Sequence, residues 1–259
     1  MEPPISPLLF AVLLLCGMLI LLETGRRLGI RRLSKESEGE RGSLGTIEGA
    51  VFALFGLVMA FSFSGAASRF NEKRMLIAEE VNTIETAYLR LQLVARPARP
   101  ELQELFRRYV DSRLDTYRRL PDMQSAEKEM AKSKKIQEEI WTDAVAATLL
   151  PDSHPDAGKL LLPALNSMID ISTTRRMALQ LHPPRVVHAL LFGLGLICSL
   201  LAGYRMAIGR NRSWLHIFGF TLITVVVVYV LLDVEYPRSG LIRLEASDQM
   251  LVEVRESMH

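Results

Sequence analysis

The sequence has few cysteines, few aromatic residues and almost no net charge. Only two cysteines occur among 259 residues, and both Cys16 and Cys198 fall inside apolar runs. This pattern excludes a disulfide framework and a thiolate metal site. The net charge of +2 is too small to indicate a nucleic-acid partner, and the basic residues lie beside the apolar runs instead. We therefore expect no nucleic acid among its partners.

Motifs for catalysis and for cofactor binding are also missing. The five histidines are scattered, and no His-x-x-x-His or Cys-x-x-Cys spacing is present to hold a metal. The sequence has no glycine-rich phosphate loop and no nucleophile elbow. We expect a protein that is not an enzyme and that carries no cofactor and no metal.

Four long apolar runs are the main feature that the sequence does have. They cover residues 5–22, 47–67, 186–204 and 214–232. Each is long enough to cross the hydrocarbon of a bilayer at ~1.5 Å per residue. A cleaved signal peptide is the competing interpretation of the first run, but no basic residue precedes that run and no small-residue cleavage site follows it. The runs predict an all-α polytopic membrane protein whose four transmembrane helices form two hairpins, residues 1–68 and 185–235.

Between the second and third runs lies a long segment with helical periodicity. The apolar spacing after the second run predicts one long helix that continues to Pro97, followed by helices over 101–120, 125–150 and 159–181. Prolines and a PDSHPDAG loop at 151–158 separate them. Because no alternating strand pattern occurs, we expect residues 69–184 to form a soluble helical bundle that continues from the second span. Residues 236–259 remain as a post-span tail.

Basic residues fix the expected topology. They are dense in the two short loops that follow the first and third runs: Arg26, Arg27, Arg31, Arg32 and Lys35, then Arg205, Arg210 and Arg212. By the positive-inside rule both loops are cytoplasmic. The N-terminus, the helical insert and the C-terminus are then expected on the extracytoplasmic side.

Two faces of the second span carry different side chains. Small residues recur every three or four positions at Gly49, Ala53, Gly56, Ala60 and Ser64, which is typical of close helix packing. Bulkier groups follow the same spacing on a neighbouring face at Phe52, Phe55, Met59 and Ser62, with Glu48 at the cytoplasmic mouth. The bulky face is either a pore wall with a hydrophobic constriction or ordinary packing within one protomer. If it lines a pore, Lys73 and Glu80 continue that face into an outer vestibule.

A compact motif follows the fourth span. Asp233, Glu235, Pro237 and Gly240 form an Asp-x-Glu-x-Pro-x-x-Gly pattern. The two carboxylates are candidates for a cation site. The structural interpretation, which we favour, is a turn in which an arginine pairs with an acid, with Arg175, Arg176, Arg238 and Arg243 as candidate partners.

Several segments together resemble the bacterial bestrophin-like membrane proteins. They are FGLVMAFSFSGAASRFNEKRMLIAEEVNTIETAYLRL at 55–91, the pair Arg175-Arg176 ahead of Pro183-Pro184, and DVEYPRSGLIRL at 233–244. The resemblance implies a multi-pass protein of the bacterial inner membrane. It also implies a homo-oligomer, a pentamer by analogy with bestrophins, that conducts inorganic ions through a pore lined by the second span. The alternative is a non-conducting sensor or scaffold whose extracytoplasmic helical domain binds a ligand or partner.

Overall fold

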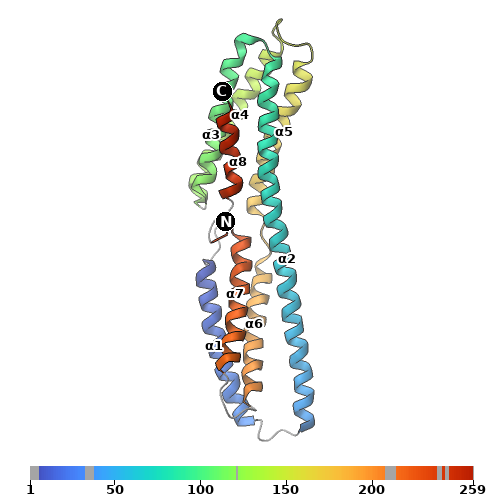
Figure 1. The fold of residues 1–259 in the computed structure, drawn as a ribbon, viewed down its shortest axis with the longest axis vertical. Helices are drawn as coiled ribbons and strands as arrows, with labels where there is room; N and C mark the ends of the chain where they lie inside the picture. The colour runs from blue at the N-terminus through green and yellow to red at the C-terminus, as the bar shows by residue number, and fades with distance from the viewer. Residues whose placement is uncertain are drawn as a thin grey trace. The chain divides into compact units, whose positions relative to one another are not determined.

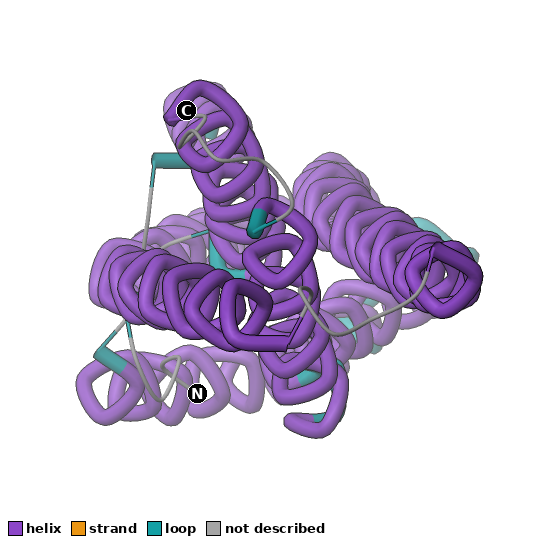
Figure 2. The backbone as a smooth tube through the Cα atoms, turned by 90° about the horizontal axis from the view of Figure 1, so that it is seen from below, coloured by secondary structure: helices purple, strands orange, loops and turns teal. Residues whose placement is uncertain are grey.

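The computed structural model describes residues 6–32, 38–120, 122–207, 214–237, 241–242 and 245–258. The α-helices are α1 (Pro7–Arg32), α2 (Glu38–Arg90), α3 (Arg99–Arg119), α4 (Met123–Thr148), α5 (Ala157–Gln180), α6 (Arg185–Met206), α7 (Trp214–Glu235) and α8 (Glu245–Ser257). Two short 3₁₀ helices, Leu91–Leu93 and Arg96–Ala98, join α2 to α3. Within these residues the secondary structure is helical and contains no strand, as Figure 2 shows. The all-α prediction is confirmed.

The four apolar runs lie in helices that are long and apolar enough to cross a membrane. They are α1, α2, α6 and α7, and each continues past the C-terminal end of its predicted run. Helix α2 is 53 residues long, which corresponds to ~80 Å at ~1.5 Å per residue. It continues beyond its apolar stretch, as the periodicity predicts, and ends at Arg90 shortly before Pro97.

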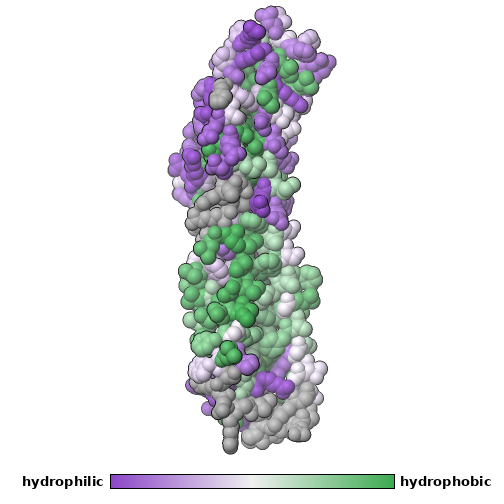
Figure 3. Space-filling view, viewed as in Figure 1, coloured by the Kyte–Doolittle hydropathy of each residue, from purple (hydrophilic) through white to green (hydrophobic). Residues whose placement is uncertain are grey.

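The chain divides into two compact units (Figure 1). The span unit consists of Pro3–Arg69 and His182–Tyr236, and the insert unit contains Phe70–Leu181 and Pro237–His259. Figure 3 shows apolar side chains gathered over α1, α6 and α7, whereas α3, α4 and α8 carry mainly hydrophilic surface. Helix α2 contributes residues to both units.

The core of the span unit is held together by close contact between α1 and α6. A Cβ atom built on Gly203 would overlap the backbone carbonyl of Leu22, and one built on Gly25 would overlap that of Leu200. Only glycine permits this approach, which is how helices commonly pack in a membrane. Leu14, Met18 and Cys198 are completely buried nearby.

The insert unit is a helical bundle around a separate apolar core. Helix α3 begins with Pro100 in its first turn, where a proline costs no hydrogen bond. It buries Phe106 and Tyr109 completely. Helix α4 begins at the N-cap Asp122, whose carboxylate accepts hydrogen bonds from the backbone N–H groups of Gln124 and Ser125.

Helix α8 completes this core, although sequence analysis described residues 236–259 only as a tail. It packs against α3 (Figure 1) and buries Leu251 and Val254 in the core of the insert unit, and Met258 directly after the helix is buried in the same core. The Arg255 guanidinium donates to the Asp111 carboxylate at 2.8 and 3.1 Å, and this ion pair is largely exposed. The C-terminal segment therefore belongs to the same structural unit as the insert.

Candidate functional site

The small-residue face of α2 is uncovered in the protomer. Ala53, Ala60 and Ser64 are exposed. A Cβ atom added to Gly49 or Gly56 would meet no other atom within 4 Å. The sequence pattern indicates close helix packing at these positions, and within one protomer no described residue occupies the space beside the two glycines. This face is free to contact another molecule.

The bulky face of α2 lies inside the span unit instead. Phe55 is only 5% exposed and lies against Gly195 of α6. The Phe52 ring meets Phe220 of α7 edge-on, with 5.8 Å between ring centroids. Phe52, Met59 and Ser62 are half-buried. The pore hypothesis placed Phe55 on a water-lined wall, but in one protomer it belongs to the apolar core.

Glu48 is also enclosed within the span unit. It is 8% exposed, and its carboxylate lies 3.3 Å from Nε of Arg205 at the end of α6. A buried carboxylate that faces an arginine is partly neutralised, because the opposite charge compensates its desolvation. The geometry therefore gives Glu48 a role in joining α2 to α6, in contrast to the expected open mouth of a pore.

At the other end of the apolar stretch, Glu235 of the post-span motif joins three segments of the span unit. It is 1% exposed. Arg69 of α2 donates to both of its carboxylate oxygens at 2.6–3.1 Å, and His182 Nδ1 lies 3.3 Å from Oε1. Between Glu48 and Arg69, α2 rises ~30 Å, which matches the hydrocarbon thickness of a bilayer.

The remainder of the post-span motif is partly described. Asp233 is 1% exposed, and Pro237 is also buried. Gly240, together with the candidate partners Arg238 and Arg243, lies outside the described residues. We expected an arginine to pair with one of the acids. Among the described residues, Arg69, which was not among the candidates, forms an ion pair with Glu235.

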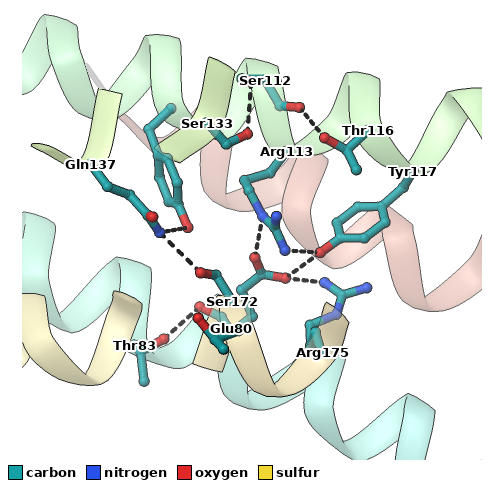
Figure 4. A network of polar contacts seen from close by, with 12 residues as sticks. Glu80, Thr83, Ser112, Arg113, Thr116, Tyr117, Ser133, Gln137, Ser172 and Arg175 are labelled. Atoms are coloured by element: carbon teal, nitrogen blue, oxygen red, sulfur yellow. Dashed lines mark hydrogen bonds and ion pairs between the residues drawn. The ribbon is translucent and has the colours of Figure 1, made fainter. Parts of the chain in front are cut away.

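An extensive polar network in the insert unit centres on Glu80 (Figure 4). Arg113 Nε donates to Glu80 Oε1 at 2.6 Å, and the Tyr117 hydroxyl donates to Oε2 at 3.0 Å. Arg175 from α5 donates to the same Oε2 atom. The Tyr117 ring also lies under the Arg175 guanidinium, 3.9 Å from its centroid. The carboxylate thus ties α2, α3 and α5 together.

A second set of hydrogen bonds extends this network across α4. Gln137 Nε2 donates to the Tyr109 hydroxyl at 3.0 Å and to Ser172 Oγ at 3.1 Å. The hydroxyls of Ser112 and Ser133 are 2.8 Å apart. Figure 4 shows these side chains pointing toward one another from α3, α4 and α5. Buried polar groups that are satisfied in this way favour one specific helix arrangement.

Burial and charge oppose each other at Glu80, which lies well beyond the apolar stretch of α2. Burial raises the pKa of its carboxyl, but Arg113 and Arg175 outweigh this effect and lower it to about 2. Burial raises the pKa of Tyr109 to about 12. Glu80 is fully buried and Lys73 is 8% exposed. Within one protomer neither side chain is open to solvent, as the outer vestibule considered from the sequence would require.

No group of three or more His, Cys, Asp and Glu side chains in the described part of the chain is arranged to hold a metal. A groove of about 870 Å³ does lie between α3 and α4. Its charged lining is mainly acidic and includes Glu101, Glu104, Arg108, Glu138, Glu139 and Asp143.

Comparison with known protein families identifies the relationship. The model of the bestrophin-like domain matches residues 26–248, from the end of α1 into α8. This chain belongs to the bestrophin-like family. The resemblance inferred from the sequence segments is therefore confirmed. No curated protein and no solved structure matches the chain.

The part of this bestrophin-like chain that matches the family model includes both faces of α2, the Glu80 network and the post-span carboxylates. Sequence analysis missed the pairing of Glu80 with Arg113 and Arg175, and it missed Arg69 and His182 as partners of Glu235. One signal was available for Glu80. It lies three residues after Ile77 and four before Ile84, within the buried stripe of α2.

Proposed function

We propose that this protein is a homo-oligomeric, bestrophin-like ion channel of the bacterial inner membrane, with inorganic ions as its cargo. Membership of the bestrophin-like family supports the proposal. The observation that carries it is the uncovered small-residue face of α2, with open space beside Gly49 and Gly56. A glycine-rich face on a membrane helix is suited to close contact with another helix, and the proposed partner is a second copy of the chain. By analogy with bestrophins the assembly is a pentamer.

The α2 geometry also suggests which bulky residues lie nearest the pore. Phe52 and Met59 each follow a glycine of the small face by three residues, so they border that face, and both are half-buried. In the proposed assembly they provide the hydrophobic constriction, which gates by exclusion of water. Phe55 and Glu48 hold α2 in the protomer, and Ser62 lies further from the contact. Lys73 and Glu80 belong to the interior of the insert unit.

The proposed orientation follows the basic loops. The N-terminus, the insert unit and the C-terminus are extracytoplasmic, and the loops after α1 and α6 are cytoplasmic. Reporter fusions at Ser125 and after Arg212 test this directly, because the two positions are expected on opposite sides. Reporter activity on the same side for both fusions would contradict the four-span topology.

Conductance of the purified full-length protein in planar bilayers tests the function. We expect discrete unitary currents, together with a native mass equal to several protomers. A Gly56→Ile variant is expected to reduce both, because the added side chain occupies the contact between copies. The control Gly193→Ile places the same side chain where a Cβ also meets no neighbour, on α6, and is expected to leave both unchanged. Silent bilayers with a monomeric mass would overturn the proposal.

The alternative is a non-conducting, non-enzymatic sensor or scaffold. The groove between α3 and α4 favours it, because its mainly acidic lining suits a cationic ligand or a basic segment of a partner. Replacing the acidic residues of this groove by lysine would then weaken binding of the ligand or partner without changing conductance. If the protein conducts and these variants conduct normally, the alternative is not needed.

A further inference from the structure

The side chain of His182 connects the segment before α6 to the C-terminal end of α7. It lies in the non-helical segment 181–184, between the end of α5 and the start of α6. Because Pro183 follows it, its backbone favours extended conformations over the α-helical region. The ring contacts Glu235, the last residue of α7, and Tyr236 directly after it. Nδ1 is 3.3 Å from Glu235 Oε1, and the ring stacks on Tyr236 at 4.7 Å between centroids.

Charged and titratable groups from every neighbouring element surround this contact. Arg69 of α2 forms an ion pair with Glu235 that is independent of His182. Arg185 and His188 of α6 also interact electrostatically with this cluster, at Tyr236 and Glu235 respectively. Among these groups the imidazoles are the ones whose type changes charge between about pH 5 and 8. The Arg69–Glu235 ion pair joins α2 to α7 without involving His182.

We propose that His182 is a proton-sensitive latch that fastens the 181–184 segment to the end of α7. Protonation turns the hydrogen bond to Glu235 into a charge-assisted one, which is roughly twice as strong as a neutral one. It also turns the stack on Tyr236 into a cation–π contact. Arg69 and Arg185 oppose the added charge, but the fully buried carboxylate lies closest to it. The latch therefore closes as the pH falls.

This latch has a defined structural consequence. The 181–184 segment is the covalent connection between α5 of the insert unit and α6 of the span unit. Closing the latch restricts the start of α6, and opening it releases the segment while the Arg69–Glu235 pair stays intact. The inference requires no ion conduction, so it stands or fails separately from the proposed channel.

Hydrogen exchange of the full-length protein in nanodiscs tests the latch. Exchange is measured at about pH 5.5 and about pH 7.5, within the range where histidine titrates, and is corrected for the intrinsic pH dependence of amide exchange. In the wild type we expect about fivefold greater protection at the lower pH in peptides that cover the start of α6 and the end of α7. In His182→Gln, which keeps a neutral donor for Glu235, we expect the same protection at both values.

Two further variants make the outcome decisive. His188→Gln is the matched control, because His188 interacts electrostatically with Glu235 but the ring that stacks on Tyr236 is that of His182. We expect this variant to retain the pH effect. Tyr236→Leu removes the stacking partner and is expected to reduce the effect without abolishing it. A pH effect that persists unchanged in His182→Gln, or that disappears in His188→Gln instead, would overturn the proposal.

Discussion

Replacing Glu80 by glutamine would remove the charge at the centre of the insert unit while keeping the size of the side chain. In the native protein the carboxylate faces Arg113 and Arg175, and all three side chains are at least 94% buried. The variant leaves two guanidinium groups in the interior without a counter-charge. Glu79, the adjacent residue, is exposed, so Glu79→Gln makes the same chemical change without the burial.

The structure sets the magnitude of the effect. Breaking a buried ion pair by removing one partner typically costs ~3–5 kcal/mol. The carboxyl pKa gives a similar figure, because a change from 4.5 to about 2 corresponds to ~3 kcal/mol. A loss of this size lowers the melting temperature of a domain like the insert unit by roughly 10 °C or more. Glu79→Gln is expected to change stability by less than ~0.5 kcal/mol.

The two tryptophans provide a selective assay. Trp141 lies in α4 of the insert unit and Trp214 in α7 of the span unit. In a Trp214→Phe background the fluorescence of Trp141 therefore reports thermal unfolding of the insert unit in the full-length protein in nanodiscs. Each Glu80 or Glu79 variant is compared with this background protein.

The pH dependence provides an independent check on the same residue. Because the folded-state pKa of Glu80 is depressed, its contribution is fully present above pH 4.5 and is lost as the pH falls toward 2. The background protein should lose this stability on acidification, and Glu80→Gln should lack that component.

A combined variant separates burial of charge from loss of packing. Glu80→Leu with Arg113→Met, Arg175→Met and Tyr117→Phe removes every charge at once, and we expect it to recover most of the stability that Glu80→Gln loses. If Glu80→Gln instead has the same melting temperature as Glu79→Gln, the Glu80 network does not contribute the stability calculated above, and the reasoning is refuted.

Three further predictions concern packing and ionisation. Gly203→Ala should destabilise the span unit by ~1–3 kcal/mol in an SDS titration followed by circular dichroism, whereas Gly193→Ala, which has open space, should not. Leu251→Ala in α8 should lower the free energy of unfolding of the insert unit by ~2–4 kcal/mol, measured by Trp141 fluorescence. Asp111→Asn breaks only the exposed ion pair and should lower it by less than ~1 kcal/mol. Tyr109, whose pKa is raised to about 12, should stay protonated at pH 11 in an absorbance titration at 295 nm, and ionisation near pH 10 would contradict its burial.

The helices of this protein were predictable because their signals are local. Uncharged runs define the spans, and prolines at 97, 100 and 121 delimit the helices of the insert. Helix α8 was missed because it is short and mostly polar. It packs against α3, and its apolar side chains Leu251 and Val254 are buried in the core of the insert unit. Its stability comes from a partner surface that the local sequence does not contain.

The environment of each α2 face was harder to infer. The small face and the bulky face are both uncharged, so helical periodicity identifies the faces without showing which one the protomer covers. The same limit applied to Glu80. Its neighbours in the network lie 33 and 95 residues away in sequence, at Arg113 and Arg175. Charge alone does not distinguish buried Glu80 from exposed Glu79.

The central claim is that the small face of α2 meets the same helix in another copy. Single cysteines test it in a Cys16→Ser, Cys198→Ser background, because a disulfide requires Cα atoms within ~7 Å. After oxidation in the membrane, Gly56→Cys is expected to give covalent dimers. Val58→Cys, which packs against the core of the span unit, is expected to remain monomeric. Equal cross-linking at both positions, or none at Gly56, would contradict the account.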